Sequence, residues 1–497
     1  MATNQSLDAV QITTDQSPDT GTATNGESLD AGAVTFRHVL GEALLGNGPL
    51  ASVTVALTAA AAFGGGALPL SVLLGALIAI TWINTPYQFS AYITSAGGLF
   101  SFIRSTLGDR FALPGGLAYY LYNLLLVPAN ALVMTSMFQY VAGVFGVKLD
   151  NWIWIPMLAV ITAIPFLLAY FRITPTLVYG VVTVTIEAVV VTAIAIALII
   201  HAGSANTAKV FVSPHLAVNG WKGVIIGMGL AYTALGGPEI VVFLGEETSN
   251  ARQTIRRALK VAQLSLIGLY LLYSYAVTVA WGPSKMGDFA LTTAPGLVLL
   301  DSIAGKVVML IVSLLILNSI IGVNVAINIT ASRMLFDQAR EGLWPAALAR
   351  THRRYQTPVL ALVITTVIEV AAAVTARLIW GPIEGFVICI VACTAGAIFS
   401  FLITDAALIR LGLARTPIGW LWLVGIPLVS MALLGVAVYG NFFPVQFPTT
   451  IGPIAILCCM FAAFVWALVR GSRATPELIA ASRGAGIREL ADEPHGG

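Results

Sequence analysis

The sequence predicts an all-α polytopic membrane protein with about twelve transmembrane helices, and two observations carry this prediction. Hydrophobic residues make up 58% of the 497-residue chain and charged residues only 10%, whereas soluble domains carry about 25% charged residues. Apolar runs long enough to cross roughly 30 Å of hydrocarbon also recur about twelve times along the chain. Because backbone polar groups in lipid must be satisfied internally, we expect each of these runs to be a helix.

The expected spans divide the chain into a membrane domain at 37–470 and two polar tails. Residues 1–36 are rich in Thr, Ser, Asp, Asn and Gly and show no apolar period, so we expect a disordered cytoplasmic tail. Residues 471–497 are expected to form a short cytoplasmic tail. The spans are expected near 38–63, 68–88, 114–144, 152–171, 175–201, 221–245, 259–281, 305–332, 358–376, 385–409, 419–439 and 451–470.

The positive charges support this count of spans. With the N-terminus in the cytoplasm, 19 of the 25 Lys and Arg residues fall on the inner side of the membrane. Positive residues are enriched in cytoplasmic loops, so this orientation places both termini inside. The other six residues fall on the outer side, namely Lys148, Lys209, Lys222, Lys285, Lys306 and Arg377.

Two of the expected spans are interrupted at matching places by glycine and proline. LGNGP, residues 45–49, interrupts the first span, and LGGP, residues 235–238, interrupts the sixth. Both residue types destabilise a helix interior, and unwound backbone at membrane depth is tolerated where it lines a cavity or is buried in protein. Spans 1–5 and 6–10 would then form two inverted repeats, at about 38–201 and 221–409, with a broken first helix in each. The alternative is that each Gly-Pro pair only kinks its helix for packing.

Ionisable residues inside the spans are functional candidates. Glu239 follows the second break and could carry a coupling proton, or its carboxylate could cap the half-helix that follows. Glu187, near the middle of the fifth span, is the other proton-coupling candidate. It could instead be a protonated side chain that donates one hydrogen bond between helices. For Glu369 in the ninth span and Asp405 in the tenth, a structural role is the preferred interpretation.

Polar residues on the third and eighth spans are further candidates. Asn123 and Asn130 share one helix face, and so do Asn324 and Asn328, because their spacings are seven and four residues. The two spans are equivalent in the inverted repeat, so Asn123 and Asn324 are candidate substrate contacts. Hydrogen bonds between helices explain such residues equally well. Tyr232, just before the second break, is a candidate for gating or binding, although aromatic residues also serve packing.

Three stretches resemble segments of the amino acid–polyamine–organocation (APC) permeases. They are SAGGLFSFIRSTLG at 95–108, GEETSNARQTIRRAL at 245–259, and ASRMLFDQAREGLWPAALARTHRRYQTP at 331–358, the last being the most specific. The resemblance covers about 38–470. It implies a LeuT-like fold with a 5+5 inverted repeat, broken helices 1 and 6, and two extra helices at about 419–470.

The resemblance also implies a substrate site built from backbone at the two breaks. In amino-acid members of the family, the substrate carboxylate is expected at N–H groups near the breaks and the ammonium at free carbonyls. This chain reads G-N-G-P where the family usually has G-S-G-I, and its fifth span carries Glu187 but no lysine, which some members use in place of a sodium ion. The positions implied as substrate-binding are Gly46, Asn47, Gly48, Ala234, Gly236 and Gly237.

These observations together favour a secondary active transporter for amino acids in the plasma (inner) membrane, working by alternating access. The proton is the expected coupling ion, and an amine or polyamine carrier or an amino-acid exchanger is the alternative within the family. A channel would need selectivity rings or filter loops, a sensor a soluble output domain, and an enzyme a cluster of His, Cys or acidic residues; the sequence indicates none of these. We expect no enzymatic activity, cofactor, metal or nucleic-acid partner, and no ATP-binding signature is present.

Overall fold

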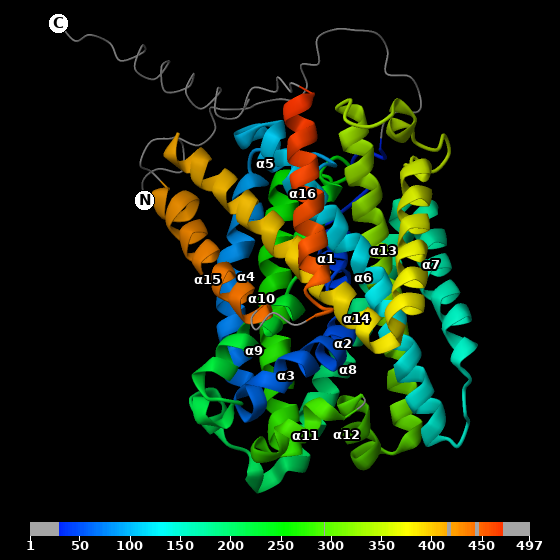
Figure 1. Ribbon diagram of the computed structural model, residues 1–497, viewed down its shortest axis with the longest axis vertical. Coiled ribbons are helices and arrows are strands. Elements are labelled where there is room, and N and C mark those ends of the chain that lie inside the picture. Colours follow the sequence, from blue (N-terminus) through cyan, green and yellow to red (C-terminus); the bar gives the residue numbers. More distant parts are fainter. Residues whose placement is uncertain (1–28, 293, 415–418, 443–446, 471–497) are drawn as a thin grey trace, which may run out of the picture.

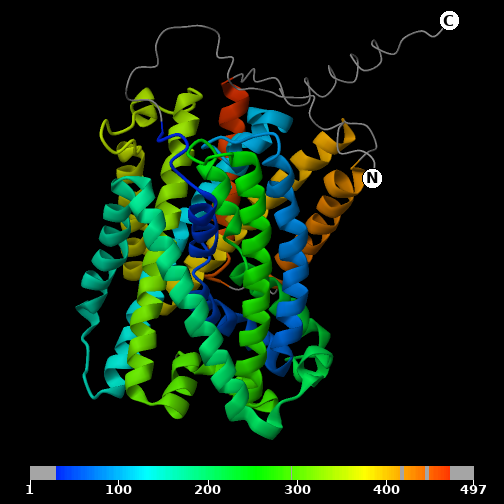
Figure 2. The same cartoon turned by 180° about the vertical axis from the view of Figure 1, so that it is seen from behind.

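The computed structural model describes residues 29–292, 294–414, 419–442 and 447–470. All of the named elements in these ranges are helical, and ten stretches are long and apolar enough to cross a membrane. Most of them stand side by side in one bundle (Figures 1 and 2). The all-helical class predicted from composition is therefore confirmed.

Two of the ten stretches each contain two of the twelve expected spans. The first, Phe36–Phe89, has 54 residues and turns at Gly65, so α3 and α4 run in different directions (Figure 1). The other is α14 (Val359–Leu413), with 55 residues, which doubles back at Gly381, where φ is 78°. The first stretch is built from α1 (Phe36–Leu45), α2 (Pro49–Ala51), the π-helix η1 (Ser52–Ala56), α3 (Leu57–Gly64), the short η2 (Gly65–Ala67) and α4 (Leu68–Phe89).

The remaining elements follow the expected spans with shifts of a few residues at several ends. The seventh expected span begins eight residues earlier, at Ala251, and the eighth continues eight residues further, to Arg340. The long elements are α6 (Asp109–Val144), α7 (Trp154–Tyr170), α8 (Ile173–Ala202), α9 (Trp221–Ala234), α10 (Ala251–Trp281), α13 (Lys306–Arg340), α15 (Ile426–Phe442) and α16 (Ile451–Val469). The short ones are α5 (Leu99–Leu107), η3 (Asn151–Ile153), η4 (Gly203–Ala205), η5 (Ala208–Phe211), η6 (Pro214–Leu216), η7 (Pro238–Leu244), η8 (Pro283–Lys285), α11 (Met286–Leu291), α12 (Pro295–Ala304), η9 (Ala346–Ala349) and η10 (Leu421–Gly425).

The interrupted helices lie at the centre of the bundle. In the most apolar part of Phe36–Phe89 and of Trp221–Leu244, 72% of the residues are buried, against 22% in α16. α1 packs against α8, α10, α13 and η7, and α2 packs against α8 and α13. The breaks are therefore enclosed by protein, which is the condition under which unwound backbone is stable at membrane depth.

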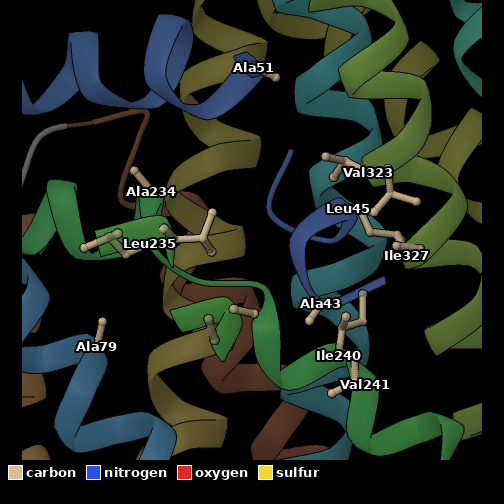
Figure 3. Close-up of a cluster of buried hydrophobic side chains, with 14 of the residues drawn as sticks. Ala43, Leu45, Ala51, Ala79, Ala234, Leu235, Ile240, Val241, Val323 and Ile327 are labelled. Carbon is tan, nitrogen blue, oxygen red and sulfur yellow. The ribbon is translucent and has the colours of Figure 1, made fainter. Parts of the chain in front are cut away.

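Leu45, the last residue of α1, fixes the position of the first break. Its side chain lies beside Val323 and Ile327 of α13 (Figure 3). A Cβ atom added to Gly322 would lie 2.4 Å from Leu45 Cδ1, and one added to Gly180 would lie 3.0 Å from Leu45 Cδ2. Small residues on α8 and α13 thus make room for this leucine, in the way that small residues allow close packing of membrane helices.

Candidate functional site

The two expected breaks are both present, and they lie against each other. Residues 46–48 separate α1 from α2, and residues 235–237 separate α9 from η7. Gly48 has φ 59° and Gly237 has φ 120°, backbone conformations that favour glycine. A Cβ atom added to Gly237 would lie only 2.8 Å from the backbone nitrogen of Asn47. The two unwound segments therefore meet in the centre of the molecule.

The side chain of Asn47 joins one break to the other. Its amide nitrogen donates hydrogen bonds to the carbonyl oxygens of Ala234, at 2.8 Å, and of Gly236, at 2.5 Å. Its amide oxygen accepts a hydrogen bond from the hydroxyl of Tyr270 on α10. These two carbonyls belong to the backbone at which the family resemblance implies an ammonium group. In this structure, the protein's own amide fills that position.

Glu187 lies at the N–H groups after the first break, where the family resemblance implies the substrate carboxylate. One carboxylate oxygen accepts hydrogen bonds from the Leu50 N–H, at 3.0 Å, and from the Ser319 hydroxyl, at 2.9 Å. The Ser319 oxygen in turn accepts from the Ala51 N–H, at 3.2 Å. Pro49 has no N–H to offer, so the amide groups that open the helix after the first break are bonded to side chains of α8 and α13. Glu187 thus accepts hydrogen bonds at this site, and its role in proton coupling stays a prediction.

Glu239 caps the second break from within its own segment. One of its oxygens accepts a hydrogen bond from the Gly237 N–H at 2.9 Å, in agreement with the capping interpretation. Its other oxygen and the hydroxyl of Tyr232 are buried and have no hydrogen-bond partner among the described residues. Glu239 acts electrostatically on the phenols of Tyr119, Tyr122 and Tyr232. Buried polar atoms without a hydrogen-bond partner are uncommon in proteins, and a ligand, a proton or a water molecule bound here would satisfy them.

The two asparagines predicted as substrate contacts are engaged elsewhere. Asn123 donates to the carbonyl of Tyr119 on its own helix, at 2.9 Å. Asn324 accepts from Asn130 of α6, at 2.8 Å, and donates to the Ile161 carbonyl of α7, at 3.2 Å. The Asn123 bond lies within α6, whereas the bonds of Asn324 hold α13 against α6 and α7. A contact between either asparagine and a substrate stays a prediction.

Three residues near the site were not predicted from the sequence. Ser319 and Tyr270 bond to the first break, and no local pattern marks them, because the bonds join positions 268 and 223 residues apart. Glu42 on α1 is buried, and neither of its carboxylate oxygens has a partner among the described residues. Glu42 lies within a run that is typical of an ordinary apolar helix. Its position inside a membrane span was the one feature of the sequence that could have marked it as a candidate functional residue.

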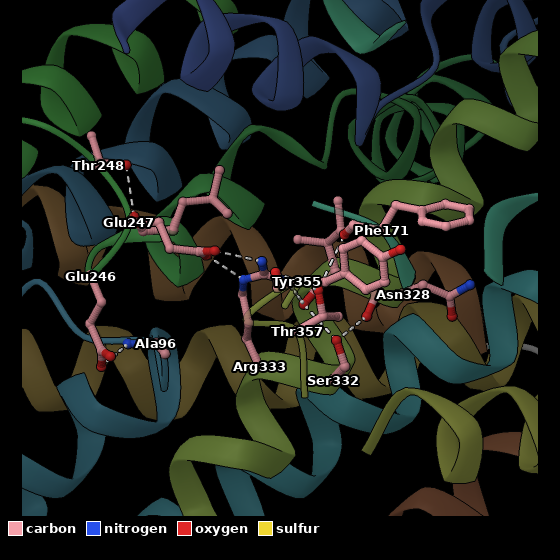
Figure 4. Close-up of polar contacts among 12 residues, drawn as sticks. Ala96, Phe171, Glu246, Glu247, Thr248, Asn328, Ser332, Arg333, Tyr355 and Thr357 are labelled. Atoms are coloured by element: carbon pink, nitrogen blue, oxygen red, sulfur yellow. Dashed lines mark hydrogen bonds and ion pairs between the residues drawn. The ribbon is translucent and has the colours of Figure 1, made fainter. Parts of the chain in front are cut away.

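A buried ion pair holds α13 against the segment that follows η7. Arg333 of α13 binds Glu247 through two hydrogen bonds, of 2.5 and 2.8 Å, and both side chains are almost fully buried (Figure 4). The backbone of Glu247 also accepts a hydrogen bond from the Val34 N–H, at 2.9 Å, and Ser249 N–H donates to Val34. The segment after the second break is therefore tied to the segment before the first.

More exposed ion pairs surround this contact. Arg340 binds Glu246, whose carboxylate also accepts a hydrogen bond from the Ala96 N–H (Figure 4). Arg104 pairs with Asp109 and Glu341. Burial alone would lower the pKa of Arg104, but its bond to Asp109 and the charge of Glu341 raise the pKa above its ordinary value. This end of the bundle is thus held together by several ion pairs between neighbouring segments.

Comparison with known proteins agrees with this geometry. Residues 38–417 match the model of a family described as amino acid permease. The chain is 26% identical over 412 residues to an uncharacterized transporter of Mycobacterium tuberculosis, covering 78% of this chain and 87% of the relative. It is also 24% identical over 360 residues to the branched-chain amino acid permease BcaP of Bacillus subtilis, covering 68% and 74% of the two chains.

Proposed function

Because the chain belongs to the amino acid permease family, we propose that it is a secondary active transporter that carries amino acids across the membrane by alternating access. The observation that supports the mechanism is the contact between two unwound segments enclosed by protein, at 46–48 and 235–237. Discontinuous helices that meet at the centre of a bundle are where secondary transporters bind their substrates. Gly46, Gly48, Gly236 and Gly237 would let a substrate approach the backbone closely.

The proposed architecture is a LeuT-like 5+5 inverted repeat with two extra helices. Counting the reversals at Gly65 and Gly381, the ten helical stretches would make twelve crossings. α5, the residues after α13 and the last turn of α16 lie at one end of the bundle, and α11 and α12 lie at the other (Figures 1 and 2). The first end carries Arg104, Arg340 and Arg470, so we assign it to the cytoplasm, together with both termini, in the plasma membrane.

We further propose that transport is coupled to protons through a buried glutamate. Glu187 and Glu239 each use one oxygen to hold backbone at a break and leave the other oxygen without a partner among the described residues. A carboxyl group in such surroundings can change its protonation state when the site opens to water or binds a substrate.

One observation favours an amine as the second candidate substrate. The N–H groups of Leu50 and Ala51 are already bonded to Glu187 and Ser319, so a substrate carboxylate finds them occupied. A substrate that carries only an ammonium group would not need them. It could bind to the free oxygens of the two glutamates.

Transport by the purified protein in liposomes tests this proposal. Tritiated leucine, isoleucine and valine are offered first, because one relative is a branched-chain permease, and the other common amino acids follow. We expect saturable uptake of at least one amino acid, reduced by an excess of the same amino acid more strongly than by its decarboxylated amine. Stronger inhibition by the amine would favour the second candidate, and no uptake or exchange of any amino acid would refute the proposal.

A further inference from the structure

The carboxylate of Glu187 stands at the place where a carboxylate ligand would bind. It belongs to α8, yet its bound oxygen meets the N–H of Leu50 and the hydroxyl that caps Ala51. α2, η1 and α3 continue one another from Pro49 to Gly64, so these amides open a helical segment whose dipole favours a negative group. Glu187 is only 1% exposed, and its second oxygen has no hydrogen-bond partner among the described residues.

We propose that Glu187 and the carboxylate of the amino-acid substrate compete for this helix end, and that this competition couples the substrate to a proton. The inference rests on the proposed function, since it requires a substrate with a carboxylate. Glu187 takes up one proton from water, its bonds to Leu50 and Ser319 weaken, and the substrate carboxylate accepts hydrogen bonds in its place. When the substrate leaves toward the cytoplasm, Glu187 gives up the proton there and returns. No covalent bond to carbon forms or breaks.

The charge of the site explains why the two events are linked. Two carboxylates at one helix end would repel each other in a site of low dielectric constant, and an empty end would leave the Leu50 N–H unpaired. A single carboxylate, from Glu187 or from the substrate, satisfies the Leu50 amide. The helix end then holds one ionised carboxylate in both states, that of Glu187 when the site is empty and that of the substrate when Glu187 is protonated.

The surroundings of Glu187 contain no competing ion among the described residues. The titratable groups that it acts on are two phenols, Tyr179 on α8 and Tyr270 on α10. The hydrogen-bonding groups that face it from α2 and α13 are the Leu50 amide and the Ser319 hydroxyl. Glu42 on the neighbouring α1 interacts instead with Arg333 and Glu247. Among the residues that the structure describes, no cation acts on Glu187 to keep it permanently ionised, so its protonation can change when the substrate binds.

Glu187→Gln separates this role from a structural one. The amide oxygen of glutamine can still accept from Leu50 and Ser319, but the side chain can neither ionise nor repel a carboxylate. The matched control is Glu369→Gln, because Glu369 is equally buried, on α14, and neither of its oxygens has a partner among the described residues. Each variant is purified and reconstituted in liposomes with the best amino acid found above, and its folding is checked by size-exclusion chromatography.

Two measurements are made on each protein. The first is accumulation driven by a pH gradient of two units, which can hold up to about 100-fold accumulation with one proton per substrate, since each pH unit corresponds to about tenfold in concentration. The second is exchange of labelled for unlabelled amino acid without a gradient. We expect wild type and Glu369→Gln to accumulate and exchange. Glu187→Gln is expected to accumulate nothing above the external concentration, although it still exchanges labelled for unlabelled amino acid.

Binding of the same amino acid to wild-type protein gives a second readout that does not depend on a variant. Calorimetry in two buffers of different ionisation enthalpy is expected to show uptake of about one proton per bound amino acid at neutral pH. Gradient-driven accumulation by Glu187→Gln, or no proton uptake by wild type, would overturn the inference while leaving amino-acid transport intact. A wild-type protein that neither accumulates nor exchanges any amino acid would overturn the proposed function as well.

Discussion

The two breaks look alike in sequence but satisfy their backbone in different ways. After the first break, the amides of Leu50 and Ala51 are held by Glu187 and Ser319, which come from helices 137 and 268 residues away in the chain. After the second, the Gly237 amide is held by Glu239, two residues along the same segment. A movement of α8 or α13 would therefore uncap the first break and leave the second capped.

This difference indicates which segments can move relative to one another during transport. The segments on one side of both breaks, α1 and η7, are joined by the Val34–Glu247 and Val34–Ser249 hydrogen bonds and by contact between Gly46 and Ile240. On the other side, α2 depends on α8 and α13. We therefore expect α1 and η7 to behave as one unit and the cap of α2 to be the part that responds to substrate. Three predictions test this, and the largest expected effect comes first.

Arg333→Ala is expected to destabilise the protein most, because it removes the buried ion pair that holds the segment after η7 against α13. Removing one partner of a buried ion pair leaves an uncompensated charge and typically costs about 3–5 kcal/mol. The buried carboxyl group of Glu247 would be left without its ion partner, beside the equally buried Glu42. The free energy of unfolding, measured by denaturant titration in detergent, should fall by that amount, and transport should be lost.

The matched control is Arg172→Ala. Arg172 pairs with Asp30 at 3.6 Å, with 60% and 28% of the two side chains exposed, and exposed pairs contribute about 0–1 kcal/mol. If Arg333→Ala were no more destabilising than Arg172→Ala, the segment after η7 would not depend on this ion pair, and the backbone bonds of Val34 would be what holds it in place.

Gly237→Ala and Gly236→Ala test whether the contact between the breaks is required. At Gly237 φ is 120°, and a Cβ atom would lie 2.8 Å from backbone Asn47 N, so the break must open. At Gly236 the nearest atoms would be Thr233 O at 3.5 Å and Tyr122 Oη at 3.9 Å, which are ordinary contacts. Strain of this kind costs about 1–3 kcal/mol, and we expect Gly237→Ala to lose uptake.

The neighbouring Gly236→Ala variant should be less destabilised and should retain more uptake than Gly237→Ala, because its Cβ atom makes only ordinary contacts. Both are assayed for the free energy of unfolding and for exchange in liposomes. Equal activity of the two variants would show that the breaks do not need to touch during transport, and the site would then have to be sought away from Asn47.

The sequence predicted the helices and the breaks well, because both depend on local signals. Apolar runs, Gly48 and Pro49 act on the segment in which they occur. The partners of the breaks could not be predicted in this way. Asn47 reaches carbonyls 187 and 189 residues away, and Ser319 carries no feature that separates it from other serines in apolar helices. Which helix faces meet is decided by the packing of the whole bundle.

Glu239→Gln is expected to have the smallest effect. It tests whether the second break, unlike the first, works without an ionisable carboxyl group. The amide oxygen of glutamine can still accept from the Gly237 N–H, and the bond lies within one segment, so the free energy of unfolding should change by less than about 1 kcal/mol. Exchange and gradient-driven accumulation should both persist, in contrast to Glu187→Gln. If Glu239→Gln instead lost accumulation but kept exchange, the proton would be carried at the second break. The locally capped glutamate, with its free oxygen among phenols, would then be the coupling group, and the cap on α2 would serve structure alone.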